Sequence, residues 1–278
     1  MKTKLLLGLF AASALSIGSA LNPSSAKAAA CPVASTQADF AAWRTTTGGN
    51  CSGTPNEYGV IVHKMGLCTN DPTPSSGSSA DYSSCSLTFE DNSGGTAASF
   101  AAGGSISLPS SLSSRPDDGT YGYALILISS TFEIEATYGP LADGTTYYST
   151  STSVGNTGTP NTTGPATTEP ITTSSFNPGV ACDSQDTVGS SSGLLTGTLL
   201  NSSEERIPDS SSVTTCSGAD YILGVVALSS PVTVDSTVTA LDATFTVTNN
   251  GTTIVSDNGG TGIIFEPGPF NVVLSVVR

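Results

Sequence analysis

The segment Tyr58–Leu67 limits the fold most, because it is a strand-length run with apolar residues at both odd and even positions. Its apolar side chains fall on both faces of a strand: Tyr58, Val60 and Val62 on one, and Ile61, Met65 and Leu67 on the other. This pattern is typical of a strand that is covered on both sides rather than on one. We therefore expect Tyr58–Leu67 to be a central strand of a β-structure.

Further strand-like runs follow and are separated by turn sequences. The longest is Thr120–Tyr138, in which the alternation loosens at Ser129-Ser130 and predicts a bulge or bend. A short N-terminal helix is expected at Thr36–Arg44. Short strands at this spacing predict an all-β fold of disulfide-stapled, sandwich-like domains. The other runs are Ser86–Glu90, Leu194–Leu200, Tyr221–Leu228, Val232–Val238, Leu241–Val247, Thr252–Val255, Gly262–Phe265 and Phe270–Val277.

The N-terminus has the features of a secretory signal peptide, which we place at residues 1–30. Lys2 and Lys4 precede an apolar run, Leu5–Ile17, that is too short to span a membrane, and small-residue cleavage sites follow. Acylation of Cys31 as a lipid anchor is the alternative. The sequence therefore predicts a secreted protein, extracellular or on the cell surface, without a membrane span.

Composition changes again in the middle of the chain. Residues 143–180 are rich in Thr, Ser, Gly and Pro and can bury little apolar surface, so we expect a connector there. This divides the remainder into an N-terminal β-domain, 31–142, and a C-terminal β-domain, 181–278. The alternative is a single large sandwich with a long inserted loop.

The charge of the chain excludes some partners. All 22 acidic residues, but only five of the eight basic residues, lie beyond residue 30, which gives that part a formal charge of −17. Such a surface repels nucleic acids and anionic membranes, so we expect no nucleic-acid partner.

Six cysteines lie beyond the signal peptide, and an even number in an exported chain predicts three disulfides. Sequential pairs are favoured because each closes one short local loop, although other connectivities stay open. The favoured pairs are Cys31–Cys51, Cys68–Cys85 and Cys182–Cys216.

The sequence predicts no cofactor and no metal. Zinc is disfavoured, because there is no Cys-x-x-Cys and only one histidine. The oxygen-rich turns Asp91-Asn92, Asp117-Asp118-Gly119 and Asp257-Asn258 offer ligands of the kind that calcium prefers. Ordinary turn chemistry is the favoured interpretation of these turns, and calcium binding is the alternative.

Catalytic residues are not apparent. A Ser-His-Asp triad would need His63, the only histidine, and no Gly-x-Ser-x-Gly motif is present, so we expect a packed or surface histidine. A pair of glycosidase carboxylates stays open, but Trp43 is the only tryptophan available for a sugar subsite. The sequence therefore favours a protein that is not an enzyme.

The run Glu57–Thr69, with Asp118–Tyr121 and Leu127–Ser129, resembles a group of exported β-rich proteins of unknown function from marine bacteria and their viruses. Such chains close with a Pro-rich turn and a terminal strand, matched here by Phe265–Phe270 and the residues after it. The group has no assigned enzymatic activity, so the resemblance implies no catalytic residues.

The C-terminal run Phe270–Arg278 follows Pro267 and Pro269 and starts a strand after a rigid turn. It is apolar on both faces, and one face holds Phe270, Val272, Leu274 and Val276. The strand either pairs within its own domain or adds to a neighbouring subunit, which would make it an assembly strand. We expect a secreted structural protein that self-associates into a homo-polymer, as a subunit of an extracellular filament or surface layer. The alternatives are a monomeric surface binding module or adhesin and, less favoured, a secreted glycan hydrolase.

Overall fold

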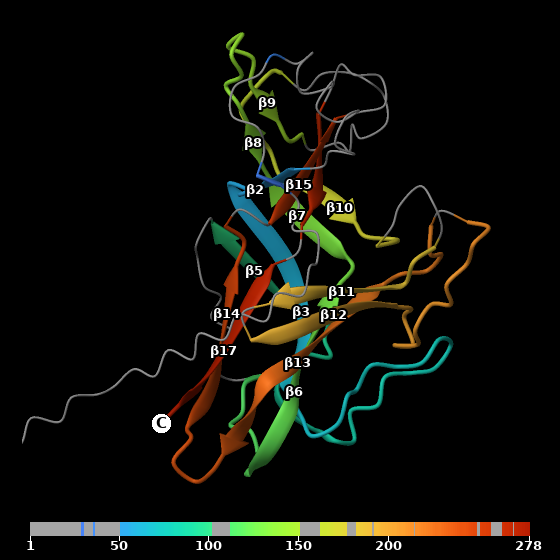
Figure 1. The fold of residues 1–278 in the computed structure, drawn as a ribbon, viewed down its shortest axis with the longest axis vertical. Helices are drawn as coiled ribbons and strands as arrows, with labels where there is room; N and C mark the ends of the chain where they lie inside the picture. The colour runs from blue at the N-terminus through green and yellow to red at the C-terminus, as the bar shows by residue number, and fades with distance from the viewer. Residues whose placement is uncertain are drawn as a thin grey trace, which may run out of the picture.

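The computed structural model describes residues 29–30, 36, 51–101, 112–150, 162–176, 182–190, 192–213, 215–248, 251–256, 263–268 and 270–278. The described residues form strands, turns and loops, and the fold class is all-β, with open antiparallel sheets (Figure 1). The predicted helix Thr36–Arg44 lies outside these residues except for Thr36, which is not helical. The predicted signal peptide likewise lies outside them, except for Ala29 and Ala30.

The strands are numbered in chain order as in Figure 1. They are β1 (Ala29–Ala30), β2 (Cys51–Gly53), β3 (Glu57–Cys68), β4 (Cys85–Glu90), β5 (Thr96–Ala101), β6 (Gly119–Ser129), β7 (Thr131–Glu135), β8 (Thr137–Tyr138), β9 (Tyr147–Tyr148), β10 (Glu169–Thr172), β11 (Gln185–Ser190), β12 (Gly193–Leu200), β13 (Tyr221–Val234), β14 (Ala240–Thr246), β15 (Thr252–Ser256), β16 (Ile263–Pro267) and β17 (Asn271–Val277).

The central strand of the largest sheet is β3. This nine-stranded sheet runs β10-β7-β3-β6-β13-β12-β11, and β4 and β5 also pair with β3. The first half of β3 pairs with β7 and β5, and its second half pairs with β6 and β4. Tyr58, Val62 and Leu67 are fully buried, whereas Ile61 is 36% exposed. The prediction of a central strand is therefore confirmed, with Ile61 as an exception on the second face.

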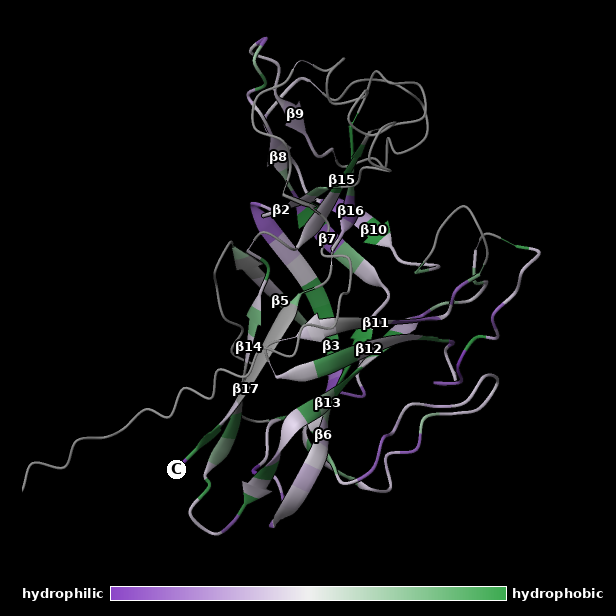
Figure 2. Cartoon of the chain, viewed as in Figure 1, coloured by the Kyte–Doolittle hydropathy of each residue, from purple (hydrophilic) through white to green (hydrophobic). Residues whose placement is uncertain are grey.

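Two smaller sheets pack against the large one. A four-stranded sheet has the order β1-β2-β15-β16, and β14 pairs with β17 in a two-stranded ribbon. One buried cluster joins Val62 and Ile128 of the large sheet to Phe265 of β16. A second joins Val226 of β13 to Leu241 of β14. The core thus lies between the large sheet and the two smaller ones, and Figure 2 shows hydrophobic colour on β12 and β13 and hydrophilic colour on the outer loops.

The long predicted strand Thr120–Tyr138 bends where its alternation loosens. The strands β6 and β7 are separated by Ser130, whose Oγ donates to the carbonyl of Ala219 at 2.8 Å and whose N–H donates to the carbonyl of Asp220 at 2.9 Å. The carbonyl of Ser130 accepts a hydrogen bond from the N–H of Thr173 at 2.8 Å. The bend is therefore held from both sides by backbone groups of other segments.

Strand pairing joins the two predicted β-domains. The strand β6, from the predicted N-terminal domain, pairs with β13 from the C-terminal one, between Tyr221↔Ser129 and Val234↔Gly119. The strand β10, inside the predicted connector, pairs with β7. The predicted boundary at residues 143–180 thus does not separate two sheets. The physical reason is that β6 lies inside the sheet, so both of its backbone edges need hydrogen-bonding partners; β3 supplies one edge, and β13 from the second half of the chain supplies the other.

Two of the three predicted disulfides are present, Cys68–Cys85 and Cys182–Cys216. Cys51 is also disulfide-bonded, while its predicted partner, Cys31, lies outside the described residues. Cys68 and Cys85 stand directly opposite each other in the β3–β4 pair, so this bridge closes the loop between the two strands.

Replacing both Cys68 and Cys85 by alanine is expected to lower the free energy of unfolding by about 3 kcal/mol, because the bridge restricts the unfolded chain. The two residues are 17 apart in the sequence. Urea unfolding without reductant measures the effect. The exposed neighbour Ser83 provides a control, since Ser83→Ala should leave stability unchanged within about 0.5 kcal/mol. An alanine pair as stable as the parent would contradict a stabilising role for the bridge.

Candidate functional site

The predicted assembly strand is paired within its own chain. The strand β17 runs antiparallel to β14 over seven residue pairs, from Ala240↔Val277 to Thr246↔Asn271. Among the described strands, these two form a ribbon of their own. Of the two predicted arrangements, the structure shows pairing within the same chain: β14 satisfies one backbone edge of β17.

Two of the four predicted assembly residues have described side chains. Phe270, just before β17, is half-buried and packs edge-on against Phe245, with ring centroids 5.5 Å apart, and against Tyr58 at 6.4 Å. Val276 is half-buried against the cluster that contains Val226. For Val272 and Leu274 only the backbone is described, and it places them opposite Phe245 and Ala243.

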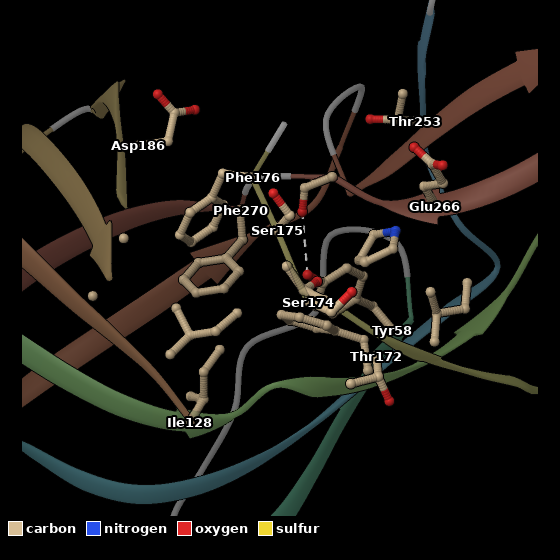
Figure 3. Close-up of a pocket in the computed structure, with 18 of the residues that line it drawn as sticks. Tyr58, Ile128, Thr172, Ser174, Ser175, Phe176, Asp186, Thr253, Glu266 and Phe270 are labelled. Carbon is tan, nitrogen blue, oxygen red and sulfur yellow. Dashed lines mark hydrogen bonds between the residues drawn. The ribbon is translucent and has the colours of Figure 1, made fainter. Parts of the chain in front are cut away.

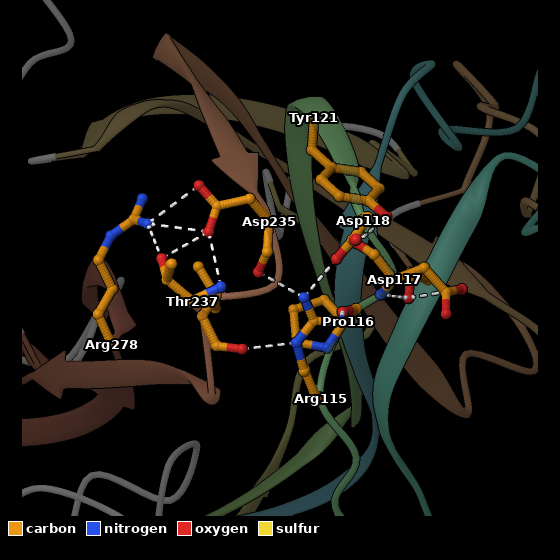
Figure 4. Close-up of polar contacts among 10 residues, drawn as sticks. Arg115, Pro116, Asp117, Asp118, Tyr121, Asp235, Thr237 and Arg278 are labelled. Atoms are coloured by element: carbon orange, nitrogen blue, oxygen red, sulfur yellow. Dashed lines mark hydrogen bonds and ion pairs between the residues drawn. The ribbon is translucent and has the colours of Figure 1, made fainter.

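A polar network holds the end of the chain (Figure 4). Arg278 donates from Nη1 to Oδ1 of Asp235 at 3.2 Å and to Oγ1 of Thr237 at 2.6 Å. The hydroxyl and N–H of Thr237 also donate to Asp235, and together with Arg278 they lower the pKa of that carboxyl. The N–H of Thr239 donates to the carbonyl of Val277 at 2.7 Å. We call Asp235, Thr237 and Arg278 the C-terminal clamp.

Arg115 braces the turn that carries the clamp. Its Nε donates to the carbonyl of Val238 at 2.5 Å, and its Nη2 contacts Asp118 and the carbonyl of Asp235 (Figure 4). Arg115 therefore ties the loop before β6 to the turn between β13 and β14. Sequence analysis missed these partners because Arg115 and Val238 are 123 residues apart.

A cleft of about 510 Å³ adjoins the start of β17. Its floor is formed by β6, β12 and β13. Residues 171–176 and Glu266, Pro267, Gly268 and Phe270 with Tyr58 complete the lining, and Phe176 lies beside Phe270 in Figure 3. This volume lies in the range of small-molecule sites in proteins. The apolar side chains of the floor are Ile126, Ile128, Leu195 and Ile222.

Two glycines face each other in the cleft floor, Gly197 of β12 and Gly224 of β13. A Cβ at Gly197 would lie 3.0 Å from Cζ of Phe176, so the missing side chain lets this ring lie close to the sheet. A Cβ at Gly224 would lie 3.1 Å from Ile126. Glycine inside a strand often marks such a close approach. The two positions are the sequence signal for the cleft, but only the strand register brings them together.

The polar groups of the cleft include hydroxyls that are hydrogen-bonded within the protein and two carboxylates. Tyr58 donates its hydroxyl to the carbonyl of Gly268 at 3.2 Å, and burial raises the pKa of this phenol. The hydroxyl of Thr172 bonds to that of Thr131 at 2.8 Å. Two carboxylates also line the cleft, Asp186, which is exposed, and Glu266, which is half-buried. Among the described residues, the lining contains no Lys, Arg or His.

The only histidine has a defined environment. The register between β3 and β6 shifts between Val62 and Lys64, so His63 is the extra residue of a β-bulge. Its Nε2 lies 2.9 Å from Oγ of Ser129, and its ring packs edge-on against Tyr221. Burial lowers the pKa of His63, while the charges of Asp91 and Glu204 raise it and Lys64 lowers it. Sequence analysis did not find the contact with Ser129.

The Ser129–His63 contact is not extended to a Ser-His-Asp triad by Asp91, the neighbouring carboxylate. Asp91 accepts hydrogen bonds from the N–H and Oγ of Ser93, at 2.9 and 2.6 Å, and from Oγ1 of Thr96 at 2.7 Å. These bonds lower the pKa of Asp91. Asp91 thus acts on His63 through its charge. The contact between His63 and Ser129 joins the bulge of β3 to the end of β6, next to the bend.

Lys64, next to this bulge, connects β3 to the loop after β12. Its Nζ lies 2.5 Å from Oε1 of Glu204 and 4.7 Å from the ring centroid of Tyr82. The backbone of Glu204 has a φ of 58°, in the left-handed region that few side chains adopt. The residue with the strained backbone, Glu204, is therefore also the one whose side chain is held to the central strand by the ion pair with Lys64.

In the turns suggested for calcium, the carboxylates of the described residues bind other side chains. Asp91 bonds to Ser93 and Thr96, Asp117 accepts from Oγ of Ser86 at 3.2 Å, and Asp118 pairs with Arg115. The turn Asp257-Asn258 lies outside the described residues. No group of three or more His, Cys, Asp or Glu side chains is placed to hold a metal within the part of the chain that the structure describes.

The described residues also contain no helix long and apolar enough to cross a membrane. Comparison of the chain with models of known protein families, with curated proteins and with solved structures finds no match. The class of protein is therefore stated from the fold alone: an all-β, disulfide-bonded protein with a paired C-terminal strand and an adjoining cleft.

We expect the free energy of unfolding to decrease as the pH is lowered from about 7 to 5, because of His63. A histidine whose pKa is lower in the folded than in the unfolded state leaves the unfolded chain with more bound protons, so acid favours unfolding below about pH 6.5. His63→Gln, which keeps a polar contact to Ser129, should flatten this part of the profile. Urea unfolding at several pH values measures it. The loss at lower pH, where Asp91 and Asp235 take up protons, should persist. An unchanged slope in the variant would contradict the assignment.

Proposed function

We propose that the protein is an exported structural subunit of an extracellular filament or surface layer, and that subunits join by exchanging β17. The observation that carries this proposal is the position of β17. Among the described strands it pairs with β14 alone, in a ribbon outside the nine-stranded sheet. The strand can therefore leave without breaking any pair of the large sheet.

Exchange replaces contacts within one chain by the same contacts between two chains. The seven residue pairs of β14 and β17 re-form, with Val276 packed as before. The clamp re-forms as well, between Arg278 of one copy and Asp235 of the next. Because the contacts are unchanged, exchange costs little and concentration decides how far it proceeds. A head-to-tail exchange that does not close into a ring gives a filament.

The connection before β17 suits this exchange. Pro267 ends β16, and Gly268 and Pro269 follow. Proline fixes φ at its own position and restricts the residue before it, so this connection has few conformations to lose when β17 pairs with another copy. The disulfides fit the same setting, since such bonds persist outside the reducing cytosol.

Mixing two single-cysteine variants, Leu241→Cys and Val276→Cys, tests the exchange. These positions stand opposite each other in the ribbon, and both are half-buried. A disulfide between them in a mixture can form only when β17 of one chain pairs with β14 of another. We expect linked dimers on non-reducing gels, formed under conditions in which negative-stain microscopy shows polymers of the parent.

The matched control replaces Val276→Cys by Ser275→Cys, whose backbone partner is Asp242, so that the two thiols are out of register. This mixture should give no linked dimer. A parent chain that stays monomeric at all concentrations, or an in-register mixture that does not cross-link, would overturn the exchange mechanism.

A second candidate function, a surface binding module, is favoured by the cleft. Its apolar floor and volume suit a small ligand. Saturable binding of octyl glucoside by the monomer, lost in Gly224→Val, would support this function. Valine at Gly224 adds side-chain atoms to the cleft floor and suits a strand. Octyl glucoside binding that survives the replacement would place the ligand elsewhere.

A further inference from the structure

We propose that the cleft beside β17 controls the rate of strand exchange: a small apolar ligand bound in the cleft holds β17 in place and slows its release. This inference rests on both functions proposed above, the exchange of β17 and the binding of a ligand in the cleft, because it names how the second regulates the first. The cleft then acts as a regulatory site of assembly.

The cleft and the start of β17 share one side chain. Phe270, the residue before β17, lines the cleft together with Gly268 (Figure 3). The same ring packs edge-on against Phe245 of β14, with centroids 5.5 Å apart, so Phe270 contacts both the cleft and the strand that β17 would leave. When β17 departs, Phe270 departs with it, because the two are adjacent in the chain. Release of the strand therefore removes part of the cleft lining.

The rest of the lining stays behind. The aliphatic floor belongs to β6, β12 and β13, which pair with one another inside the large sheet. Tyr58 of the central strand donates its hydroxyl to the carbonyl of Gly268 at 3.2 Å and thereby holds the chain just before Pro269. We place the hinge of the exchange after Gly268, between a part of the lining that is held and the one lining side chain that leaves.

A ligand in the cleft therefore distinguishes the paired chain from the open one. A ligand that fills the cleft touches Phe270 while β17 is paired with β14, and it loses this contact when β17 is free. Binding to the paired state alone stabilises that state by a factor of 1 + [L]/Kd. Since every exchange passes through the open state, opening should become slower by up to about elevenfold at ten times Kd.

The exchanged chains regain the site, so the ligand changes the rate of exchange and not its final extent. Phe270 of one copy takes the place of Phe270 of the next, because β17 re-forms the same pairs with β14. The cleft is then complete again, with its floor and Gly268 from one copy and Phe270 from another. A ligand with equal affinity for two states does not shift the equilibrium between them.

Cross-linking of Leu241→Cys with Val276→Cys measures the rate of exchange, and octyl glucoside below its micelle-forming concentration is the probe. Oxidant is supplied in excess, so that opening of β17 limits the formation of linked dimers. Calorimetric titration gives the Kd of octyl glucoside. We expect the rate to fall as the concentration passes this Kd, by up to about elevenfold at ten times Kd, while the final yield of linked dimers stays the same. Methyl glucoside, which has the sugar without the octyl chain, should leave the rate unchanged.

Two replacements, each made in both cysteine variants, assign the effect to the cleft and to Phe270. Gly224→Val fills the floor and should remove the effect of octyl glucoside on the rate. Phe270→Leu stays apolar but loses the ring contacts with Phe245 and Tyr58, so β17 should exchange faster without ligand, and octyl glucoside should slow it less than in the parent. The matched control is Phe89→Leu, a buried ring of β4 outside the lining, which should keep the full effect of octyl glucoside.

The outcomes separate this inference from the two functions on which it rests. Saturable binding of octyl glucoside with an unchanged rate of cross-linking overturns the inference and leaves both functions in place. Absence of saturable binding overturns the binding function, absence of linked dimers in every condition overturns the exchange, and either result overturns the inference as well. A rate that falls equally in the Gly224→Val background, or in methyl glucoside, assigns the effect to the additive in general and overturns the inference.

Discussion

The contacts of Tyr58 hold together the parts of the molecule on which the rest depends. The side chain is fully buried in the central strand, and its ring packs edge-on against Phe132 of β7, with centroids 5.6 Å apart. Its hydroxyl donates to the carbonyl of Gly268, and its ring also meets Phe270. A single residue of β3 therefore positions the bend of the large sheet, one wall of the cleft and the start of β17. Loss of the phenol oxygen would leave a buried carbonyl without this donor, which costs more than the bond itself contributes.

Local features of the fold followed from the sequence because they depend on neighbouring residues. The double apolar pattern of Tyr58–Leu67 requires cover on both faces, and β3 has it for nearly all of its side chains. The break at Ser129-Ser130 predicted a bend, and the structure bends there. Cys68–Cys85 and Cys182–Cys216 are sequential pairs, so the short loops between them were enough to indicate the partners.

Long-range features could not be predicted in this way. The apolar residues at odd and even positions of β6 indicate cover on both of its faces, but they do not say that β13 pairs with its edge. The strand β10 was hidden inside the predicted connector, because it contains Pro170 and only one large apolar residue, Ile171. The cleft depends on Gly197 and Gly224 coming into register, and the clamp depends on Arg278 meeting Asp235, 43 residues before it. Each of these arises from pairing, which a pattern along one strand does not encode.

The edges of the sheets explain why β17 is the strand suited to exchange. The edge strand β10 holds Pro170, which cannot donate to a further strand, and the edge strand β11 holds the exposed acid Asp186. Both features oppose pairing with another chain. The strand β17, in contrast, contains neither proline nor charge over its seven residues. Since it pairs with β14 alone among the described strands, its departure would break no pair of the nine-stranded sheet, although Val276 would leave the cluster that contains Val226. In the proposed assembly, association is thereby directed away from the large sheet and toward the ribbon, where the β14 edge that β17 leaves would accept the β17 of a second copy.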